Sequence, residues 1–443
     1  MKADIRIAWI LARGSERRER WRASLTLFGA LLATGFALAA VTVASLSGQV
    51  SIPYAHGLLD RPGERAGVVF TLVLLLVPVL GLLGQCARIG AVHRSRRMAG
   101  LRLAGASPGQ VRRIAAAESS LACLAGSAAG FTAFLVLLAV VGHTPRPAAW
   151  AGFAAVVLGV PVAAALVSAL ALRRLVASPL DHVRRTAPDP GRRAAAGLLV
   201  AALLLALSAL LLLFPVGPQV TPPVLLVLAL VLLTGAGAIW VAGASAGYLG
   251  RRLTRRAERP AVLIAASRLA HDPWAAARTH AALLLLTVVA VGFVGVREIL
   301  LDMLTGAWRP ADMAFYTTGI DLVGAAVLIA LAIALCALAV GTAESLATRR
   351  RGLAIQVAAG VPHRVLAEAT LLETALPLAP ALLLACLGGT LVHVGYAMVA
   401  GAASIPLLPL LVPVTVYAAC LLAAATSLPL LRRAAHPAEL RFS

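Results

Sequence analysis

Long apolar blocks alternate with short basic loops along almost the whole chain. A helix needs roughly 20 apolar residues to cross a bilayer, and each block approaches or exceeds that length. The alternation predicts an all-α polytopic membrane protein with about ten transmembrane helices, at residues 23–48, 67–87, 116–141, 149–172, 195–214, 222–246, 280–300, 319–343, 367–397 and 405–431. The block 367–397 contains Pro377 and Pro380, which predicts either a kinked span or a re-entrant piece.

The composition supports the same class of protein. Hydrophobic residues make up 60% of the chain and charged residues 13%, whereas an average globular chain has about 25% charged residues. A signal peptide has an apolar core of about 7–15 residues, and the first block, 23–48, is longer than that. Residues 1–22 are therefore interpreted as an interfacial helix that precedes an uncleaved first span.

The basic residues are distributed unequally between the two predicted sides of the membrane. The chain has 39 Lys and Arg residues and a formal net charge of +21. Nearly all of them lie in the terminal segments and in alternate loops, and the opposite loops contain only Arg61, Arg65, Arg146, Arg297 and Arg309. The positive-inside rule therefore predicts a multi-pass protein of the cell membrane with both termini in the cytoplasm. Because the arginines stand beside apolar blocks, they favour contact with membrane lipids over a nucleic-acid partner.

A basic loop on the predicted cytoplasmic side carries the clearest local signals. Its sequence, RRMAGLRLAGASPGQVRR, occupies residues 96–113. It predicts a basic helix, a break at Gly105, and a new helix with Ser107 as its N-cap and Pro108 at the first helical position. Gln110 completes a capping box with Ser107. The loop is thus expected to form a helical elbow that leads into the next span.

A degenerate copy of this loop, RRGLAIQVAAGVPHRVLA, occupies residues 350–367. We name the two loops the first and the second elbow. The elbows divide the chain into two four-helix modules joined by a two-helix insert. An even number of predicted spans separates the two elbows, so the two modules are expected to be parallel. The expected domains are residues 1–190 for the first module, 191–258 for the insert and 259–443 for the second module.

The repeated arrangement of four spans with a basic elbow after the second span resembles the FtsX-like permease family of ABC transporters. In that family a four-span module carries a cytoplasmic G-A-[ST]-x-x-Q-V stretch after its second span, followed by a glutamate that enters the third span. The first elbow matches this pattern at Gly105, Ala106, Ser107, Gln110, Val111 and Glu118. The second elbow keeps Pro362 and Val365, has Arg364 in place of the glutamine, and places Glu373 one residue further on.

The resemblance implies that each elbow holds a coupling helix that seats on a separate ATPase subunit. One chain with two modules would bind two ATPase copies, which favours one chain per complex over a homodimer. The loops 49–66 and 301–318 are too short for the large extracellular domain of many family members. The candidate coupling residues are Arg96, Arg97, Gly105, Ala106, Ser107, Pro108, Gln110, Val111 and Arg113 in the first elbow, and Arg350, Arg351, Gly360, Pro362 and Val365 in the second.

The sequence offers no motif for ATP chemistry in this chain. Its only lysine is Lys2, whereas a Walker A loop needs a lysine beside the phosphates. The zinc motif H-E-x-x-H does not occur. We therefore expect a non-enzymatic subunit that binds no cofactor, with ATP and Mg²⁺ on the partner ATPase.

Some of these residues have two interpretations. Glu118 and Glu373 enter apolar spans, either as switch or substrate-path groups or as headgroup-level anchors at helix starts. The elbow arginines contact either an acidic groove of an ATPase or lipid phosphates. The pair Gly126 and Gly130 favours close helix packing within the bundle over a dimer seam.

Three functions remain open at the level of the sequence. The favoured one is an ABC permease subunit that moves a hydrophobic or amphipathic substrate, such as a lipid, a peptide or a drug. A mechanotransmission regulator would use the same ATPase coupling to act on an extracytoplasmic partner. An ATP-independent secondary transporter is disfavoured, because such proteins commonly have inverted repeats and charged pairs near the midplane.

Overall fold

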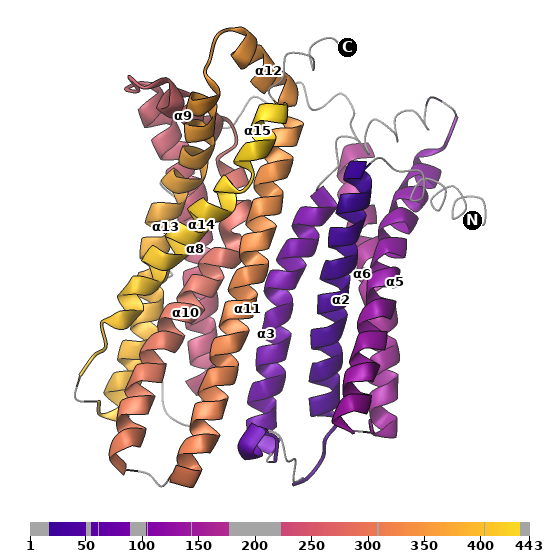
Figure 1. Cartoon of the computed structure of the whole chain (residues 1–443), viewed down its shortest axis with the longest axis vertical. Coiled ribbons are helices and arrows are strands. Elements are labelled where there is room, and N and C mark those ends of the chain that lie inside the picture. Colours follow the sequence, from indigo (N-terminus) through magenta and orange to yellow (C-terminus); the bar gives the residue numbers. More distant parts are fainter. Residues whose placement is uncertain are drawn as a thin grey trace. The chain divides into compact units, whose positions relative to one another are not determined.

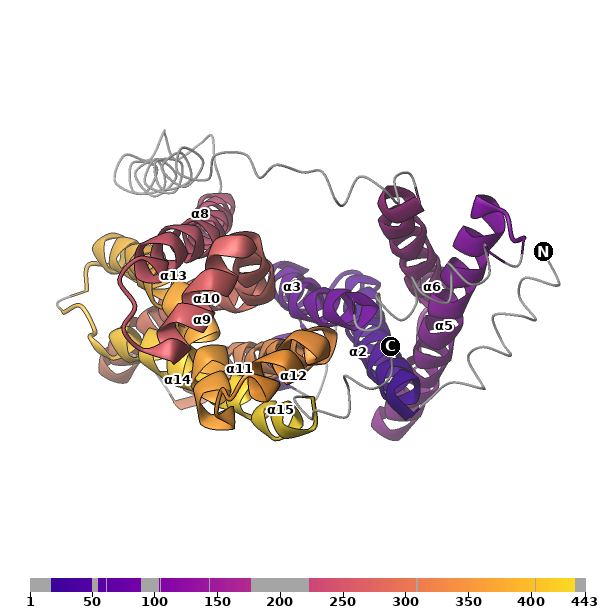
Figure 2. The same ribbon diagram turned by 90° about the horizontal axis from the view of Figure 1, so that it is seen from above.

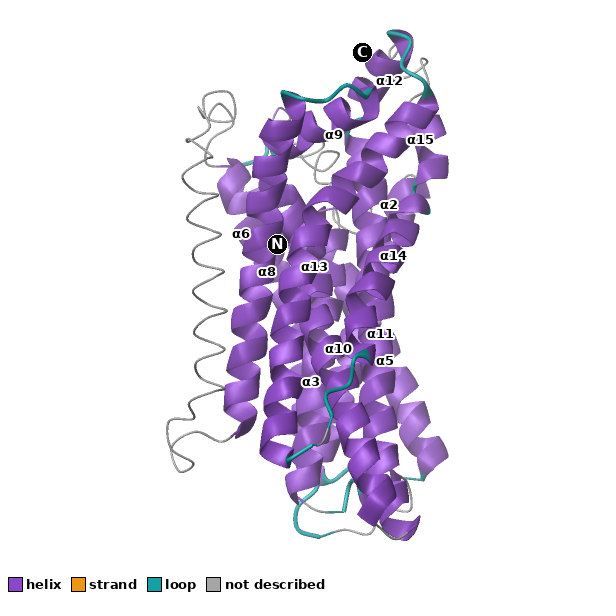
Figure 3. Cartoon of the chain, turned by 90° about the vertical axis from the view of Figure 1, so that its left-hand side faces the viewer, coloured by secondary structure: helices purple, strands orange, loops and turns teal. Residues whose placement is uncertain are grey.

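The computed structural model describes residues 17–49, 55–60, 62–88, 103, 105–142, 144–176, 223–307, 310–402 and 404–434. Over these ranges the backbone forms helices and loops and no strand (Figures 1 and 3). The chain divides into two compact units, Met1–Thr186 and Ala187–Ser443. The predicted all-helical class is thereby confirmed for the described part of the chain.

The first unit is built from four long helices. They are α2 (Arg17–Ala44), α3 (Pro62–Arg88), α5 (Pro108–Val141) and α6 (Pro147–Val176), with a short 3-10 turn, η1 (Ala55–Gly57), between the first two. Helix α2 packs against the other three, and α5 also packs along α6. On α6, Phe153 makes edge-on contacts with Phe131 and Phe134 of α5.

Small residues let α5 approach the backbone of α2 closely. A Cβ on Gly126 would lie 2.3 Å from the carbonyl oxygen of Leu27, and one on Gly130 would meet the same helix at 2.8 Å. Between them, the hydroxyl of Thr34 donates a hydrogen bond of 3.0 Å to Ser127. The glycine pair therefore packs inside the bundle, as the sequence favoured.

The second unit contains more elements, and α8, α10 and α13 form its centre. Helix α11 packs on α10, and α14 packs on α13 and α11. Gly388 of α13 approaches Thr234 of α8 so closely that a Cβ would lie 2.0 Å from the threonine Cγ2. The elements are α8 (Pro223–Thr254), α9 (Pro260–His271), α10 (Pro273–Ala307), α11 (Pro310–Thr348), α12 (Arg350–Ala358), α13 (His363–Ala400), η3 (Leu408–Leu411), α14 (Val412–Ala425) and α15 (Leu428–Ala434).

Seven of the described helical stretches are long and apolar enough to cross a membrane, which makes this a membrane protein: Ala23–Ala44, Ser120–Val141, Ala229–Thr254, Pro273–Leu304, Met313–Thr348, His363–Ala400 and Leu408–Arg432. Two other predicted spans appear as shorter apolar helices, Gly67–Leu80 and Ala149–Ala164. The span predicted at 195–214 lies outside the described residues, so the arrangement of ten spans in two modules stays a prediction.

In the second unit, the structure bears on what the sequence predicted for helices α13 and α8. Helix α13 runs as one helix through Pro377 and Pro380, so the re-entrant alternative is wrong. Membrane helices tolerate internal proline because neighbouring groups compensate for the lost hydrogen bond. Helix α8, assigned to the insert at 191–258, falls within the second unit and packs against α10 and α13. The domain boundaries themselves remain a prediction.

Candidate functional site

The first elbow has the local structure that its sequence predicts. Gly105 has a φ of +94°, a left-handed conformation that favours glycine. Ser107 is extended and caps α5, which begins at Pro108. The amide of Gln110 donates to the hydroxyl of Ser107 at 3.2 Å, and the amide of Ser107 donates to Oε1 of Gln110 at 2.8 Å. The capping box therefore fixes the angle at which the chain enters α5.

The second elbow follows the same backbone path with different side chains. Helix α12 ends at Ala358, and Gly360 then has a φ of +91°. Pro362 is extended and occupies the N-cap of α13, which begins at His363, without a side-chain capping bond. A left-handed glycine, one intervening residue and an extended cap thus precede a long helix in both elbows.

The N-cap residues of α5 and α13 align the two elbows one residue differently from the alignment that the sequences predicted. Comparison of the letters pairs Pro108 with Pro362, but the structure makes Pro362 the equivalent of the cap Ser107. Once the caps are matched, Glu118 and Glu373 lie at the same distance from the start of their helices. The predicted one-residue offset of Glu373 is therefore wrong. The two glutamates are equivalent positions of the repeated elbow.

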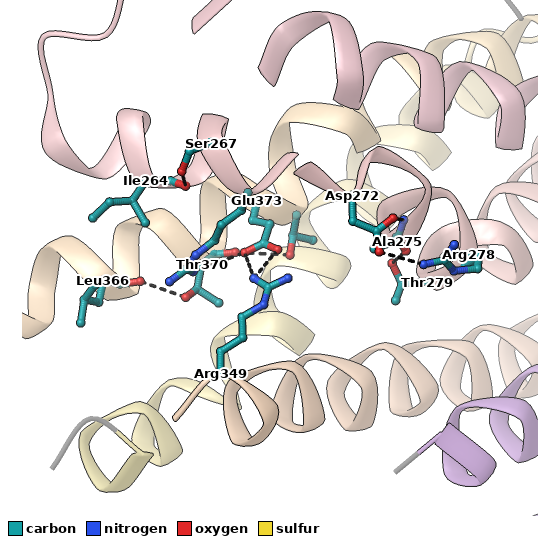
Figure 4. Close-up of polar contacts among 12 residues, drawn as sticks. Ile264, Ser267, Asp272, Ala275, Arg278, Thr279, Arg349, Leu366, Thr370 and Glu373 are labelled. Atoms are coloured by element: carbon teal, nitrogen blue, oxygen red, sulfur yellow. Dashed lines mark hydrogen bonds and ion pairs between the residues drawn. The ribbon is translucent and has the colours of Figure 1, made fainter. Parts of the chain in front are cut away.

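Glu373 joins three parts of the second elbow through one carboxylate. Arg349, the N-cap residue of α12, points at it in Figure 4 and donates from Nη1 to Oε1 at 2.7 Å and to Oε2 at 3.0 Å. Arg268 of α9 donates to Oε2 at 3.4 Å. We name these three residues the Glu373 clamp. It connects α9 and the α11–α12 junction to α13.

The clamp is partly shielded from water. The side chains of Arg268 and Glu373 are 15% and 23% exposed. Burial lowers the pKa of Arg268; the neighbouring charge of Glu373 opposes this change, and the positive charge of Arg349 adds to it. Arginine still stays charged at neutral pH, because its guanidinium has a pKa above about 12 in water. Glu373 therefore faces protein cations and holds two of them together.

A small apolar core supports the same elbow. Leu346 of α11, Leu353 of α12, Leu366 of α13 and Leu431 of α15 form one buried cluster. Next to it, Val365 packs with alanines of α9 and α13. Val365 is thus partly buried by this packing, and its role in docking stays a prediction.

The other candidate residues differ in exposure. Arg96 and Arg97 lie outside the described residues, and the side chains of Pro108 and Val111 are not described. Ala106 is half-buried and Glu118 is buried. Arg350 is half-buried and donates from Nε to the carbonyl of Ala347 at 3.0 Å. The exposed candidates are Gly105, Ser107, Gln110, Arg113, Arg351, Gly360 and Pro362.

Sequence reasoning missed two parts of this site. Arg268 has no local motif, and only the structure brings it to Glu373, 105 residues away in the chain. Ile355 of α12 is 53% exposed and lies in the exposed surface of the second elbow, together with Arg351. The described residues contain no group of His, Cys, Asp and Glu that could hold a metal ion.

The first unit thus combines four helices with a capped elbow before the third of them, α5. The family model described as FtsX-like permease C-terminal matches residues 68–180, which contain most of α3, the first elbow, α5 and α6. The match confirms the resemblance to the FtsX-like permease family over this part of the chain. The family indicates a permease component of the ABC transporter type. No curated protein matches the chain.

Proposed function

We propose that this chain is the transmembrane permease subunit of an ABC transporter. A separate ATPase would dock at both elbows and drive export or extraction of a hydrophobic or amphipathic substrate, such as a lipid, a peptide or a drug. The observation that carries the proposal is the repeated elbow. Both copies have a left-handed glycine, an extended cap, and a glutamate at the same place in the following helix. Two such elbows fit two ATPase subunits for each chain.

The contacts of the second elbow support a route for motion. Arg351 and Ile355 expose a face of α12 that a partner can reach. Arg349 at the start of α12 is ion-paired to Glu373. Because Glu373 stands on α13, which packs against α8 and α10, a displacement of α12 would act on the helices at the centre of the unit.

The ATPase activity is assigned to the partner. The only lysine of the chain is Lys2, and no Walker A sequence occurs. ATP and Mg²⁺ would therefore bind to the other polypeptide, and this chain would contribute the docking surface and the membrane helices.

Charge reversal on both elbows tests the docking. We expect the double variant Arg113→Glu with Arg351→Glu to abolish co-purification of a P-loop ATPase encoded by an adjacent reading frame. The stimulation of ATP hydrolysis by that ATPase should fall at least about tenfold. The reason is that each reversal places a carboxylate against an acidic partner surface. Arg146→Glu is the matched control, since this exposed arginine lies beyond the other end of α5. Unchanged co-purification and stimulation in the double variant would refute the docking.

A further inference from the structure

The turn between α8 and α9 concentrates positive charge. Residues 251–260 read RRLTRRAERP and include a single acid, Glu258. We name the five arginines of this turn the arginine corner: Arg251, Arg252, Arg255, Arg256 and Arg259. Arg251 is half-buried and the other four are exposed. Five guanidinium groups within nine residues repel one another, so the folded turn carries a strong local field.

These charges lack the acidic partners that other arginines of the second unit have. Arg268 and Arg349 pair with Glu373, and Arg278 pairs with Asp272 at 3.1 Å (Figure 4). Within the ranges that the structure describes, no member of the arginine corner forms an ion pair. The corner is therefore suited to an anion that comes from outside the chain.

Aromatic side chains place the arginine corner at the level of lipid headgroups. The candidate span of α8 ends at Thr254, within the corner. Tyr248 is 50% exposed and lies one helical turn before Arg252, from whose Nη1 it accepts a hydrogen bond of 3.2 Å. Exposed Tyr and Trp side chains gather at membrane interfaces, and Trp274, which is 37% exposed, lies against Gly243 of α8, about two turns before Arg251.

Helix α9, which follows the arginine corner, also indicates a position at the level of the lipid headgroups. Figure 2 shows α9 crossing the end of the bundle formed by α8, α10 and α13, which it contacts. Its inner face buries Ala261, Ala265 and Leu269, while Leu263 on the other face is 43% exposed. An exposed leucine beside exposed arginines is typical of a helix that lies in the membrane interface.

We propose that the arginine corner binds the phosphate of an anionic phospholipid in the leaflet that it faces. Arginine presents a planar fork of donors that matches phosphate oxygens in bidentate geometry. The adjacent Tyr248 and Leu263 provide apolar surface for the upper part of the acyl chains. A soluble protein partner would supply the charge but would leave these interfacial side chains without a lipid environment.

The test measures lipid preference in vesicles with the full chain. Trp274 reports contact through quenching by dibrominated lipid once the other five tryptophans are replaced by phenylalanine. Dibrominated phosphatidylglycerol is compared with dibrominated phosphatidylcholine at equal mole fraction. The variant is Arg255→Gln with Arg256→Gln. The matched control is Arg278→Gln with Arg364→Gln, which removes the same charge from arginines that already have acidic partners. Thermal unfolding of each protein shows that it is folded.

We expect the wild type and the control to prefer phosphatidylglycerol, and the preference to fall about fivefold for each arginine neutralised in the corner. Native mass spectrometry of the released proteins should show the matching loss of retained phosphatidylglycerol. An unchanged preference in Arg255→Gln with Arg256→Gln would overturn the proposal. It would also be overturned if that variant lost a co-purifying protein partner while its lipid preference stayed intact.

Discussion

Glu373 is bound by two arginines that would repel each other without it. Arg349 approaches its carboxylate to 2.7 Å and Arg268 to 3.4 Å. Loss of the negative charge would leave two partly buried guanidinium groups close together, which is a larger penalty than the loss of a single contact. The position of α9 and α12 relative to α13 therefore depends on one side chain.

This dependence can be measured at the residue scale. We expect Glu373→Gln to lower the free energy of unfolding by about 2 kcal/mol, less than for a fully buried pair, because the side chain of Arg349 is 36% exposed and water screens part of its charge. Thermal unfolding in detergent, followed by tryptophan fluorescence, gives the value. Glu368→Gln breaks the exposed pair with Arg364 on the same helix and should cost about 0.5 kcal/mol or less. Equal losses in both variants would contradict the clamp.

At the scale of single elements, Gly126 has less room for an added Cβ than any other described glycine of the first unit, and the atom that such a Cβ would meet belongs to the backbone. The position of Gly126 allows α5 to reach the carbonyl of Leu27, which cannot rotate away as a side chain would. Gly159 of α6, in contrast, has no heavy atom within 4 Å of the place where a Cβ would stand. The two glycines therefore separate the effect of packing from the effect of helix propensity.

We expect Gly126→Ala to destabilise the first unit by about 1–3 kcal/mol, because α2 and α5 must move apart to admit the methyl group. Gly159→Ala should be neutral or stabilising by up to about 1 kcal/mol, since alanine favours the helix and meets open space. Both values follow from thermal unfolding of the purified protein. An equal loss of unfolding free energy in both variants would show that the close approach of α5 to α2 at Gly126 does not depend on the missing Cβ.

The elbows show which elements could be predicted from the sequence. The cap Ser107, its partner Gln110 and the following Pro108 are local signals within four positions, and all three have the predicted places. The second elbow has lost these signals, so matching letters aligned the wrong proline, and only the φ of Gly360 and the cap Pro362 reveal the correspondence. The clamp was beyond prediction, because no periodic pattern relates α9 to a residue in α13.

At the scale of the whole chain, the seven candidate spans of the described residues were predictable because membrane helices follow from composition over about 20 residues. The relative direction of the two modules is a different kind of inference. It rests on the even number of spans expected between the two elbows, together with the arginine distribution that predicts a cytoplasmic position for both. Each unit nevertheless provides two exposed positions at opposite ends of one long helix, so the direction is open to experiment.

Single cysteines at these positions test the parallel arrangement. In the first unit they are Ser107→Cys and Thr144→Cys, which flank α5, and in the second Pro362→Cys and Ser404→Cys, which flank α13. All four sites are exposed, and the five native cysteines are first replaced by alanine. We expect both elbow cysteines to react with a membrane-impermeant maleimide only from the cytoplasmic side, and the other two only from outside.

The labelling pattern also separates the functional classes. Helix α5 has 34 residues and α13 has 38, so each exceeds the roughly 20 residues that a bilayer requires and cannot have both ends on one side while it spans the membrane. Parallel modules place both elbows where ATPase subunits can reach them. Labelling of Ser107→Cys and Pro362→Cys from opposite sides would mean inverted repeats. That outcome would exclude docking of one ATPase pair and favour the architecture of a secondary transporter.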